Sequence, residues 1–268
     1  MKLNILPLKP ISNPWLIREG CNIVNNPEEA DFIIYENVGE PHREILHTKR
    51  LYPNSKLVFI LSGDTNFSDD TCIWFASNIV PSERRFQLYI TNPRLYGISP
   101  GFGDKTIFGY FGGTIWNKPE RTFMKDLPEK WVINECKNYW GAPQNDRIKI
   151  TKQSYEFIRR SCYTLCPRGN GPSSMRIAEA LACGSIPILI HDETNPFDED
   201  FGGLCIRLAL DDIPNFTNII DKMPIPDATD FNRCVEFYKN NICIYNDIDW
   251  SISSGQSHKI IERLRELK

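Results

Sequence analysis

The sequence lacks the features that mark several common classes of protein. It has no run of about 18 uninterrupted apolar residues, so no integral membrane segment is expected. Its formal charge of -3 offers no overall basic character, so nucleic acid is not expected as a partner. Four scattered histidines and the absence of any CxxC spacing predict no metal site. The first ten residues, MKLNILPLKP, are too short and too broken by proline for a signal peptide.

Cysteine, by contrast, is present in an odd number, nine, and most of the cysteines lie inside apolar patterns. Buried free thiols in a reducing compartment are therefore expected, which favours a cytoplasmic location. A length of 268 residues permits one large or two small domains. The hydrophobic content of 41% and charged content of 24% are ordinary for a soluble globular protein.

Apolar runs of strand length alternate with amphipathic segments along the chain, which predicts an α/β protein built from two Rossmann-like halves. A helix is expected at 69–77, and the turn-rich stretch 141–146 (GAPQND) is the best candidate for a linker. This divides the chain into residues 1–140, residues 141–255 and a terminal amphipathic helix at 256–268. Strands are expected at 3–6, 32–35, 56–61, 79–80, 86–90, 106–111, 131–134, 162–166, 186–190 and 204–210.

The stretch 161–190, SCYTLCPRGNGPSSMRIAEALACGSIPILI, is the centre of the sequence. An apolar strand at 162–166 leads into a loop rich in glycine and proline. Ser173 or Ser174 can cap a helix, Gly184 ends that helix, and a second apolar strand follows at 186–190. A strand, helix and strand joined this tightly predict a right-handed βαβ unit.

The loop of this unit carries groups suited to an anion. Arg168, Gly169, Ser173 and Ser174 would supply a guanidinium, backbone N–H groups and hydroxyls at the N-terminus of a helix. One turn further on, Arg176 and Glu179 lie away from the main apolar stripe. Plainer explanations are a surface ion pair for Arg176 and Glu179, a helix cap for the serines and a tight turn for the glycines. The loop matches neither GK[ST] nor GxGxxG, so chemistry alone indicates only an anion-binding loop.

The run LCPRGNGPSSMRIAEALACGSIPILI resembles the signature of the exostosin-like glycosyltransferases, family GT47. In that family CPRG, a serine, an arginine, EAL, a glycine and IPV follow one another in this order. The family also has an apolar strand ending in FxG with an arginine some residues later, as in Phe111–Gly113 and Arg121 here. Animal and plant members of the family are membrane-anchored, whereas no membrane segment is expected here. A soluble microbial or viral-type member, or an excised domain, is therefore expected.

The resemblance implies a GT-B fold, in which two Rossmann-like domains face a cleft, and a UDP-sugar as donor. It implies that Glu179 holds the ribose of the donor and that Arg168, Ser174 and Arg176 hold its diphosphate. No cofactor or metal is expected, because GT-B enzymes generally stabilise the leaving group with protein charges. The acceptor is expected to be a glycan bound by residues 1–140. The resemblance implies an inverting or a retaining transfer, depending on the branch of the family, and an inverting one is expected here.

An inverting transfer needs a base to take the proton of the acceptor hydroxyl. Carboxyl ends of strands in the first half are the expected place, which points to Glu36, Glu40 and His42 after the strand 32–35 and to Asp64 after the strand 56–61, with Asp64 and Glu40 ranked first. For each of these a turn or surface role is the competing explanation. His191, after the strand 186–190, lies beside the donor loop and is a further candidate for contact with the sugar.

The sequence thus predicts a metal-independent glycosyltransferase. A GDP-fucose-type fucosyltransferase is the nearest alternative, since such enzymes also use a βαβ donor loop with an arginine and a glutamate. A non-catalytic module that binds a nucleotide or glycan, and a binding protein for a phosphorylated metabolite, are the others.

Overall fold

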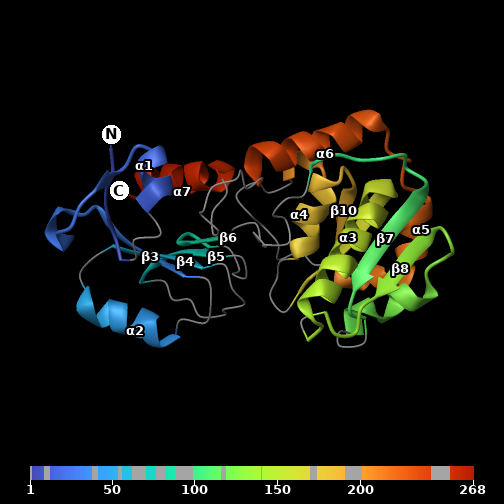
Figure 1. Cartoon of the computed structure of the whole chain (residues 1–268), viewed down its shortest axis with the longest axis horizontal. Coiled ribbons are helices and arrows are strands. Elements are labelled where there is room, and N and C mark those ends of the chain that lie inside the picture. Colours follow the sequence, from blue (N-terminus) through green and yellow to red (C-terminus); the bar gives the residue numbers. More distant parts are fainter. Residues whose placement is uncertain are drawn as a thin grey trace.

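The computed structural model describes residues 2–8, 13–37, 42–53, 56–61, 71–76, 82–87, 99–115, 119–139, 141–169, 174–190, 201–242 and 254–268. Within these ranges the chain forms two sheets, and every pair of neighbouring strands is parallel. The sheets lie at opposite ends of the long axis, each with its own helices (Figure 1). The predicted α/β class with two Rossmann-like halves is confirmed.

The first sheet has six strands in the order β2-β1-β3-β4-β5-β6. Its strands are β1 (Asn4–Pro7), β2 (Asn22–Ile23), β3 (Phe32–Asn37), β4 (Leu57–Leu61), β5 (Ile73–Ala76) and β6 (Arg85–Gln87). Short connections carry helix α1 (Asn13–Arg18), the 3-10 turn η2 (Pro27–Glu29) and helix α2 (His42–Leu51).

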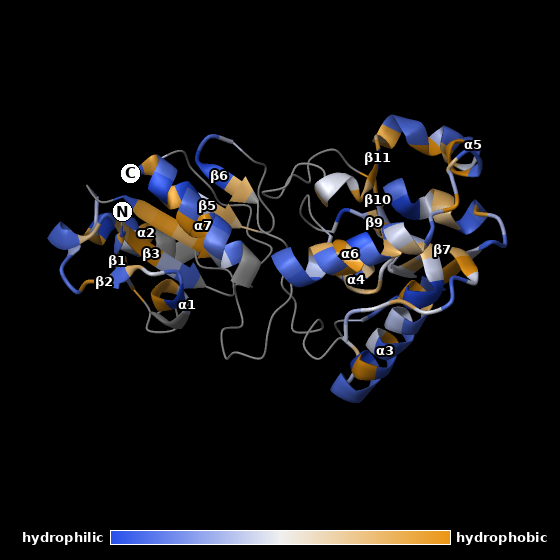
Figure 2. Ribbon diagram, turned by 90° about the horizontal axis from the view of Figure 1, so that it is seen from above, coloured by the Kyte–Doolittle hydropathy of each residue, from blue (hydrophilic) through white to orange (hydrophobic). Residues whose placement is uncertain are grey.

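Successive residues of these strands point to opposite faces of the sheet, so a continuous apolar run fills two cores. Ile34 and Ile60 belong to the core that includes side chains of α1, whereas Ile33 and Phe59 belong to the core on the other face. Figure 2 shows these strands as strongly hydrophobic, while the helices carry hydrophilic residues beside their apolar ones.

The last helix of the chain, α7 (Ser254–Leu267), packs on the first sheet rather than on the second (Figure 1). Ile260, Ile261 and Leu264 recur at helical spacing and are fully buried in the core that also holds Trp15 and Leu16. The predicted terminal helix exists, and its apolar face makes it part of the first unit.

The second sheet has five strands in the order β11-β10-β9-β7-β8. They are β7 (Ile107–Gly113), β8 (Trp131–Glu135), β9 (Ser161–Pro167), β10 (Ile186–Ile190) and β11 (Ile206–Leu208). The helices of this unit are η4 (Pro119–Asp126), α3 (Gln144–Arg160), α4 (Met175–Ala182), η5 (Phe201–Gly203), η6 (Leu210–Asn215), α5 (Phe216–Asp221) and α6 (Ala228–Asn241).

The predicted boundary at 140–141 does not coincide with the change of sheet. β7 pairs with β9 through Gly109 and Tyr163, and β8 pairs with β7, so both strands belong to the second sheet. The proposed linker at 141–146 runs directly into α3, which begins at Gln144 and connects β8 to β9 within one unit. Partner choice among apolar strands depends on contacts far apart in sequence, which local patterns do not contain.

The helix expected at 69–77 is wrong where the structure describes it, because Ile73–Ala76 is strand β5. All four of its side chains are buried, and they alternate between the two cores of the first sheet. A short run that is apolar at every position has no period that separates a strand from a helix. The strand expected at 79–80 lies outside the described residues.

Candidate functional site

The predicted βαβ unit forms as expected and places one strand end against one helix start. All seven residues of β9 are buried, and β10 pairs with it in parallel over five positions. Ser174 is the N-cap of α4, and its hydroxyl accepts a hydrogen bond from the backbone N–H of Arg176 at 3.4 Å. Because β7, β9 and β10 are parallel, their carboxyl ends meet at this edge of the sheet.

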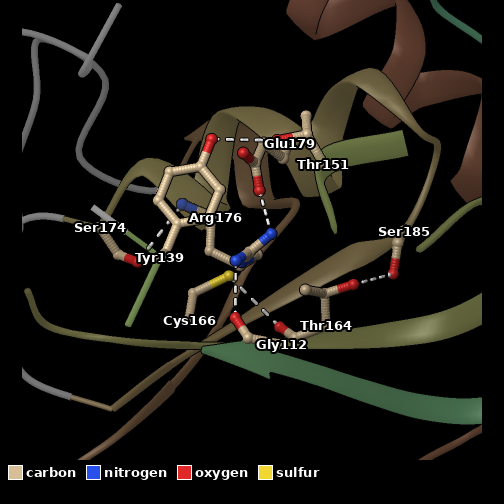
Figure 3. A network of polar contacts seen from close by, with 9 residues as sticks. All are labelled: Gly112, Tyr139, Thr151, Thr164, Cys166, Ser174, Arg176, Glu179 and Ser185. Carbon is tan, nitrogen blue, oxygen red and sulfur yellow. Dashed lines mark hydrogen bonds and ion pairs between the residues drawn. The ribbon is translucent and has the colours of Figure 1, made fainter. Parts of the chain in front are cut away.

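Arg176 and Glu179 form a buried ion pair one turn into α4 (Figure 3). The exposed fraction of the side chain is 10% for Arg176 and 1% for Glu179. The guanidinium also donates from Nη2 to the carbonyl oxygen of Gly112 at 2.6 Å. The expectation that both side chains lie off the buried face of the helix is therefore wrong, because every residue of α4 from Arg176 to Ala182 is buried.

This pair fixes the charge state of the arginine. Burial alone would lower the pKa of Arg176, but the carboxylate of Glu179, with Tyr110 and Cys166, raises it above its ordinary value. Arg176 is thus a permanent cation that joins α4 to the end of β7. The ribose and diphosphate roles that the resemblance implies for Glu179 and Arg176 remain predictions.

Arg168 follows β9 directly and reaches toward η4. Its Nε–H donates to Oε1 of Glu120 at 3.0 Å, and about a third of its side chain is exposed. The next residue along η4, Arg121, donates from Nη2 to the carbonyl oxygen of Arg168 and from Nη1 to that of Thr114 at 2.7 Å. Through these two hydrogen bonds Arg121 links the segment after β7 to the segment after β9.

Three guanidinium groups therefore gather at the carboxyl edge of the second sheet. Burial lowers the pKa of Arg121, and the positive charges of Arg176 and Arg168 lower it further, against the opposing effect of Glu120. With Glu120 and Glu179 as the two partner carboxylates, the cluster carries one positive charge in excess. Such an excess favours an anionic ligand at this edge.

Arg121 and Glu120 were not among the site residues expected from the sequence. In the sequence Arg121 belongs only to the pattern that follows β7, and nothing local marks Glu120 as a site residue. Both become part of the cluster because β7 and β9 are neighbours in the sheet. A signal did exist for Arg121, namely its place some residues after a strand that ends in FxG.

Tyr110 adds a buried polar atom to the same region. Its ring is fully buried and stacks on Phe157 with centroids 5.5 Å apart. Its hydroxyl lies over Gly112, where a Cβ atom would collide with it, and within the described part of the chain it has no hydrogen-bond partner. Glycine is thus required at position 112 for Tyr110 to adopt this rotamer.

The remaining expected donor residues are only partly described. Gly169 follows Arg168 and is partly buried. Ser173 and His191 lie outside the described residues. Among the two serines proposed as helix cap, the structure assigns the cap to Ser174.

The expected catalytic bases are likewise not brought together by the described structure. Glu40 and Asp64 lie outside the described residues, and His42 is the first residue of α2, just after that gap. A carboxylate that is described at this edge of the first sheet is Glu36, which is 5% exposed and accepts a hydrogen bond from Nε1 of Trp15 at 3.2 Å.

Two further properties concern metals and membranes. Across the described ranges, no three His, Cys, Asp or Glu side chains are grouped so that they could hold a metal ion. No helix in those ranges is long and apolar enough to cross a membrane.

The sequence matches the profile of a known protein family. The sequence profile described as the Exostosin GT47 domain matches residues 55–223, which is more than half of the chain and includes both β7 and the βαβ unit.

Curated relatives from plants match a shorter part of the chain. The probable glucuronosyltransferase GUT1 of Oryza sativa subsp. japonica is 31% identical over 127 residues, covering 45% of this chain and 30% of that protein. The probable beta-1,4-xylosyltransferase IRX10 of Arabidopsis thaliana is 28% identical over 130 residues, with the same 45% and 30% coverage. These matches therefore span less than a third of the relatives' length.

Among solved structures, the DNA-modifying enzyme beta-glucosyltransferase aligns over 99% of this chain and 100% of its own, with a TM-score of 0.45 and 10% identity.

Proposed function

Because this chain belongs to the exostosin GT47 family, we propose that it is a glycosyltransferase that moves a sugar from a UDP-sugar to a carbohydrate acceptor. The plant relatives are named as probable glucuronosyl- and xylosyltransferases, which supports a sugar nucleotide as donor. The choice of UDP follows from what the family resemblance implies. The observation that carries the proposal is the cluster of Arg121, Arg168 and Arg176 around the signature strand.

The transfer forms a bond between an acceptor oxygen and the anomeric carbon, and it breaks the bond from that carbon to the donor's diphosphate oxygen. The electron pair leaves with the diphosphate, and the acceptor proton passes to a base. Negative charge therefore develops on the diphosphate in the transition state. Prearranged guanidinium groups stabilise such charge without reorganising at the moment of reaction.

Arg168 is the cluster member best placed to meet a ligand, because about a third of its side chain is exposed whereas that of Arg176 is nearly covered. The N-cap Ser174 and the first N–H groups of α4 lie at the same strand edge and add the positive end of the helix dipole. We propose a metal-independent, inverting reaction, in which these groups supply the positive charge and Glu40, His42 or Asp64 takes the proton.

Isothermal titration of the protein with UDP and then GDP, with chelator present throughout, tests the donor. Micromolar binding of UDP, about 8 kcal/mol of binding free energy, supports the proposal. Arg168→Ala should weaken that binding by about tenfold or more, because a charged hydrogen-bond partner of the diphosphate contributes about 1.5–3 kcal/mol. Lys152→Ala on the exposed side of α3 is the control with the same change of charge.

The other outcomes separate the alternatives. Preference for GDP would identify the fucosyltransferase alternative. Binding of UDP without turnover of any UDP-sugar and glycan acceptor would indicate a non-catalytic module. Activity that is lost with EDTA and restored by Mn²⁺ would contradict the metal-independent mechanism. Failure to bind either nucleotide would remove the proposed function.

A further inference from the structure

Arg168 is held from two sides by consecutive residues of η4. Glu120 binds its side chain through the Nε edge of the guanidinium, with Nε and Oε1 3.0 Å apart. Arg121 binds its backbone carbonyl and at the same time the carbonyl of Thr114. One short segment therefore sets both the path of the chain after β9 and the direction in which the Arg168 side chain extends.

The ion pair between Glu120 and the side chain of Arg168 is partly shielded from water. The exposed fraction of the side chain is 10% for Glu120 and 33% for Arg168. The contact uses the Nε edge of the guanidinium, and the opposite edge, formed by the two Nη groups, is the fork that suits a phosphate. A free arginine has many rotamers and loses them when it binds, so a partner that orders it beforehand makes ligand binding more favourable.

From this geometry we infer that Glu120 is a positioning residue, which orients Arg168 for the diphosphate of the donor. The inference rests on the proposed function and adds a residue to it. It is unexpected on charge alone, because a carboxylate beside a diphosphate site repels the ligand. The two effects of Glu120, orientation of the arginine and repulsion of the anion, have opposite signs and can be separated by substitution.

The variants are Glu120→Ala, which removes both the charge and the acceptor oxygen, and Glu120→Gln, which removes the charge and keeps an acceptor for Nε–H. If Glu120 positions Arg168, Glu120→Ala weakens UDP binding by about 3- to 10-fold, the effect of leaving one side chain to be ordered by the ligand. Glu120→Gln restores affinity to the wild-type value or better. Tighter binding by both variants would show that Glu120 acts only through its charge and would overturn the inference.

A double-mutant cycle shows whether the effect passes through Arg168. In an Arg168→Ala background, Glu120→Ala should change UDP affinity by less than twofold, because the side chain that it orients is gone. Additive losses would mean that Glu120 acts by another route. Glu129→Ala, an exposed carboxylate of the same unit, is the control for the change in net charge.

A second measurement needs no nucleotide. The Arg168 Nε–H resonance of the isotope-labelled protein should exchange slowly with water in the wild type and in Glu120→Gln, and quickly in Glu120→Ala. Fast exchange in the wild type would overturn the inference whatever the protein binds. Wild-type protein that shows slow exchange but binds neither UDP nor GDP would refute the proposed function, and with it the positioning role. UDP binding that is equal in wild type and Glu120→Ala would refute the positioning role alone.

Discussion

Replacement of Arg176 by methionine is the most demanding test of the buried ion pair in α4. Methionine keeps much of the length and helical propensity of arginine but removes the charge. The side chain of Glu179, which is 1% exposed, then loses its cationic partner, and the carbonyl of Gly112 loses a donor at 2.6 Å. Removing one partner of a buried ion pair costs about 3–5 kcal/mol of unfolding free energy, because the other charge stays buried after the opposite charge is lost.

Urea denaturation followed by circular dichroism measures this change, provided that the slope of unfolding free energy against urea concentration is unchanged. Arg263→Met is the matched control, since Arg263 and Glu266 form the same i,i+3 pair on α7 but are 46% and 62% exposed. The control should lose no more than about 1 kcal/mol.

The double variant Arg176→Met/Glu179→Leu distinguishes charge from packing. With both charges absent, no buried charge of the pair remains and the carbonyl of Gly112 lacks its arginine donor, so the expected loss falls to about 1–3 kcal/mol. Two results would contradict a stabilising role for the buried charges: a double variant that is less stable than Arg176→Met, or a loss of stability in Arg176→Met no larger than in the control on α7.

Three further predictions concern the second unit. Burial lowers the pKa of Lys105 from 10.5 to about 8, so as the pH rises the folded protein releases this proton before the unfolded chain does. The free energy of unfolding should therefore rise between pH 8 and about 10.5, by roughly 3 kcal/mol. Urea titrations across this pH range should show the rise in the wild type and not in Lys105→Met. Gly184→Ala should destabilise by about 1–3 kcal/mol in the same assay, because φ is +60° and the new Cβ would lie 2.7 Å from Cδ1 of Phe102. Burial raises the pKa of Cys183 and of Cys234 to about 12, so pulsed alkylation with mass spectrometry should leave both unmodified in the native protein.

A specific result would contradict each of these three predictions. A slope against pH that is the same in Lys105→Met and wild type would show that other groups cause the rise. Gly203→Ala is the control for Gly184→Ala, since Gly203 has φ +73° and nothing lies within 4 Å of the added Cβ. An equal loss of unfolding free energy in both variants would show that the contact with Phe102 does not destabilise Gly184→Ala. Rapid native labelling of Cys183 would contradict its burial, whereas the partly exposed Cys136 and Cys205 should react.

The α/β class, most strand positions and the βαβ unit could be predicted from local sequence patterns. These depend on local facts: apolar runs of strand length, a serine that caps a helix and a glycine at a positive φ after it. The resemblance to GT47 came from the same stretch, because its signature residues are close together in sequence.

Which strands share a sheet, and which charged side chains come into contact, follow from the three-dimensional packing of the chain. β7 joins the second sheet by pairing with β9 across about 50 residues of chain, and this pairing brings Arg121 to Arg168 and Gly112 to Arg176. Local periodicity cannot report such contacts, because it records which face of an element is apolar and not what covers that face. For the same reason Arg176 and Glu179, which look like a surface pair in sequence, are a buried pair in the folded protein.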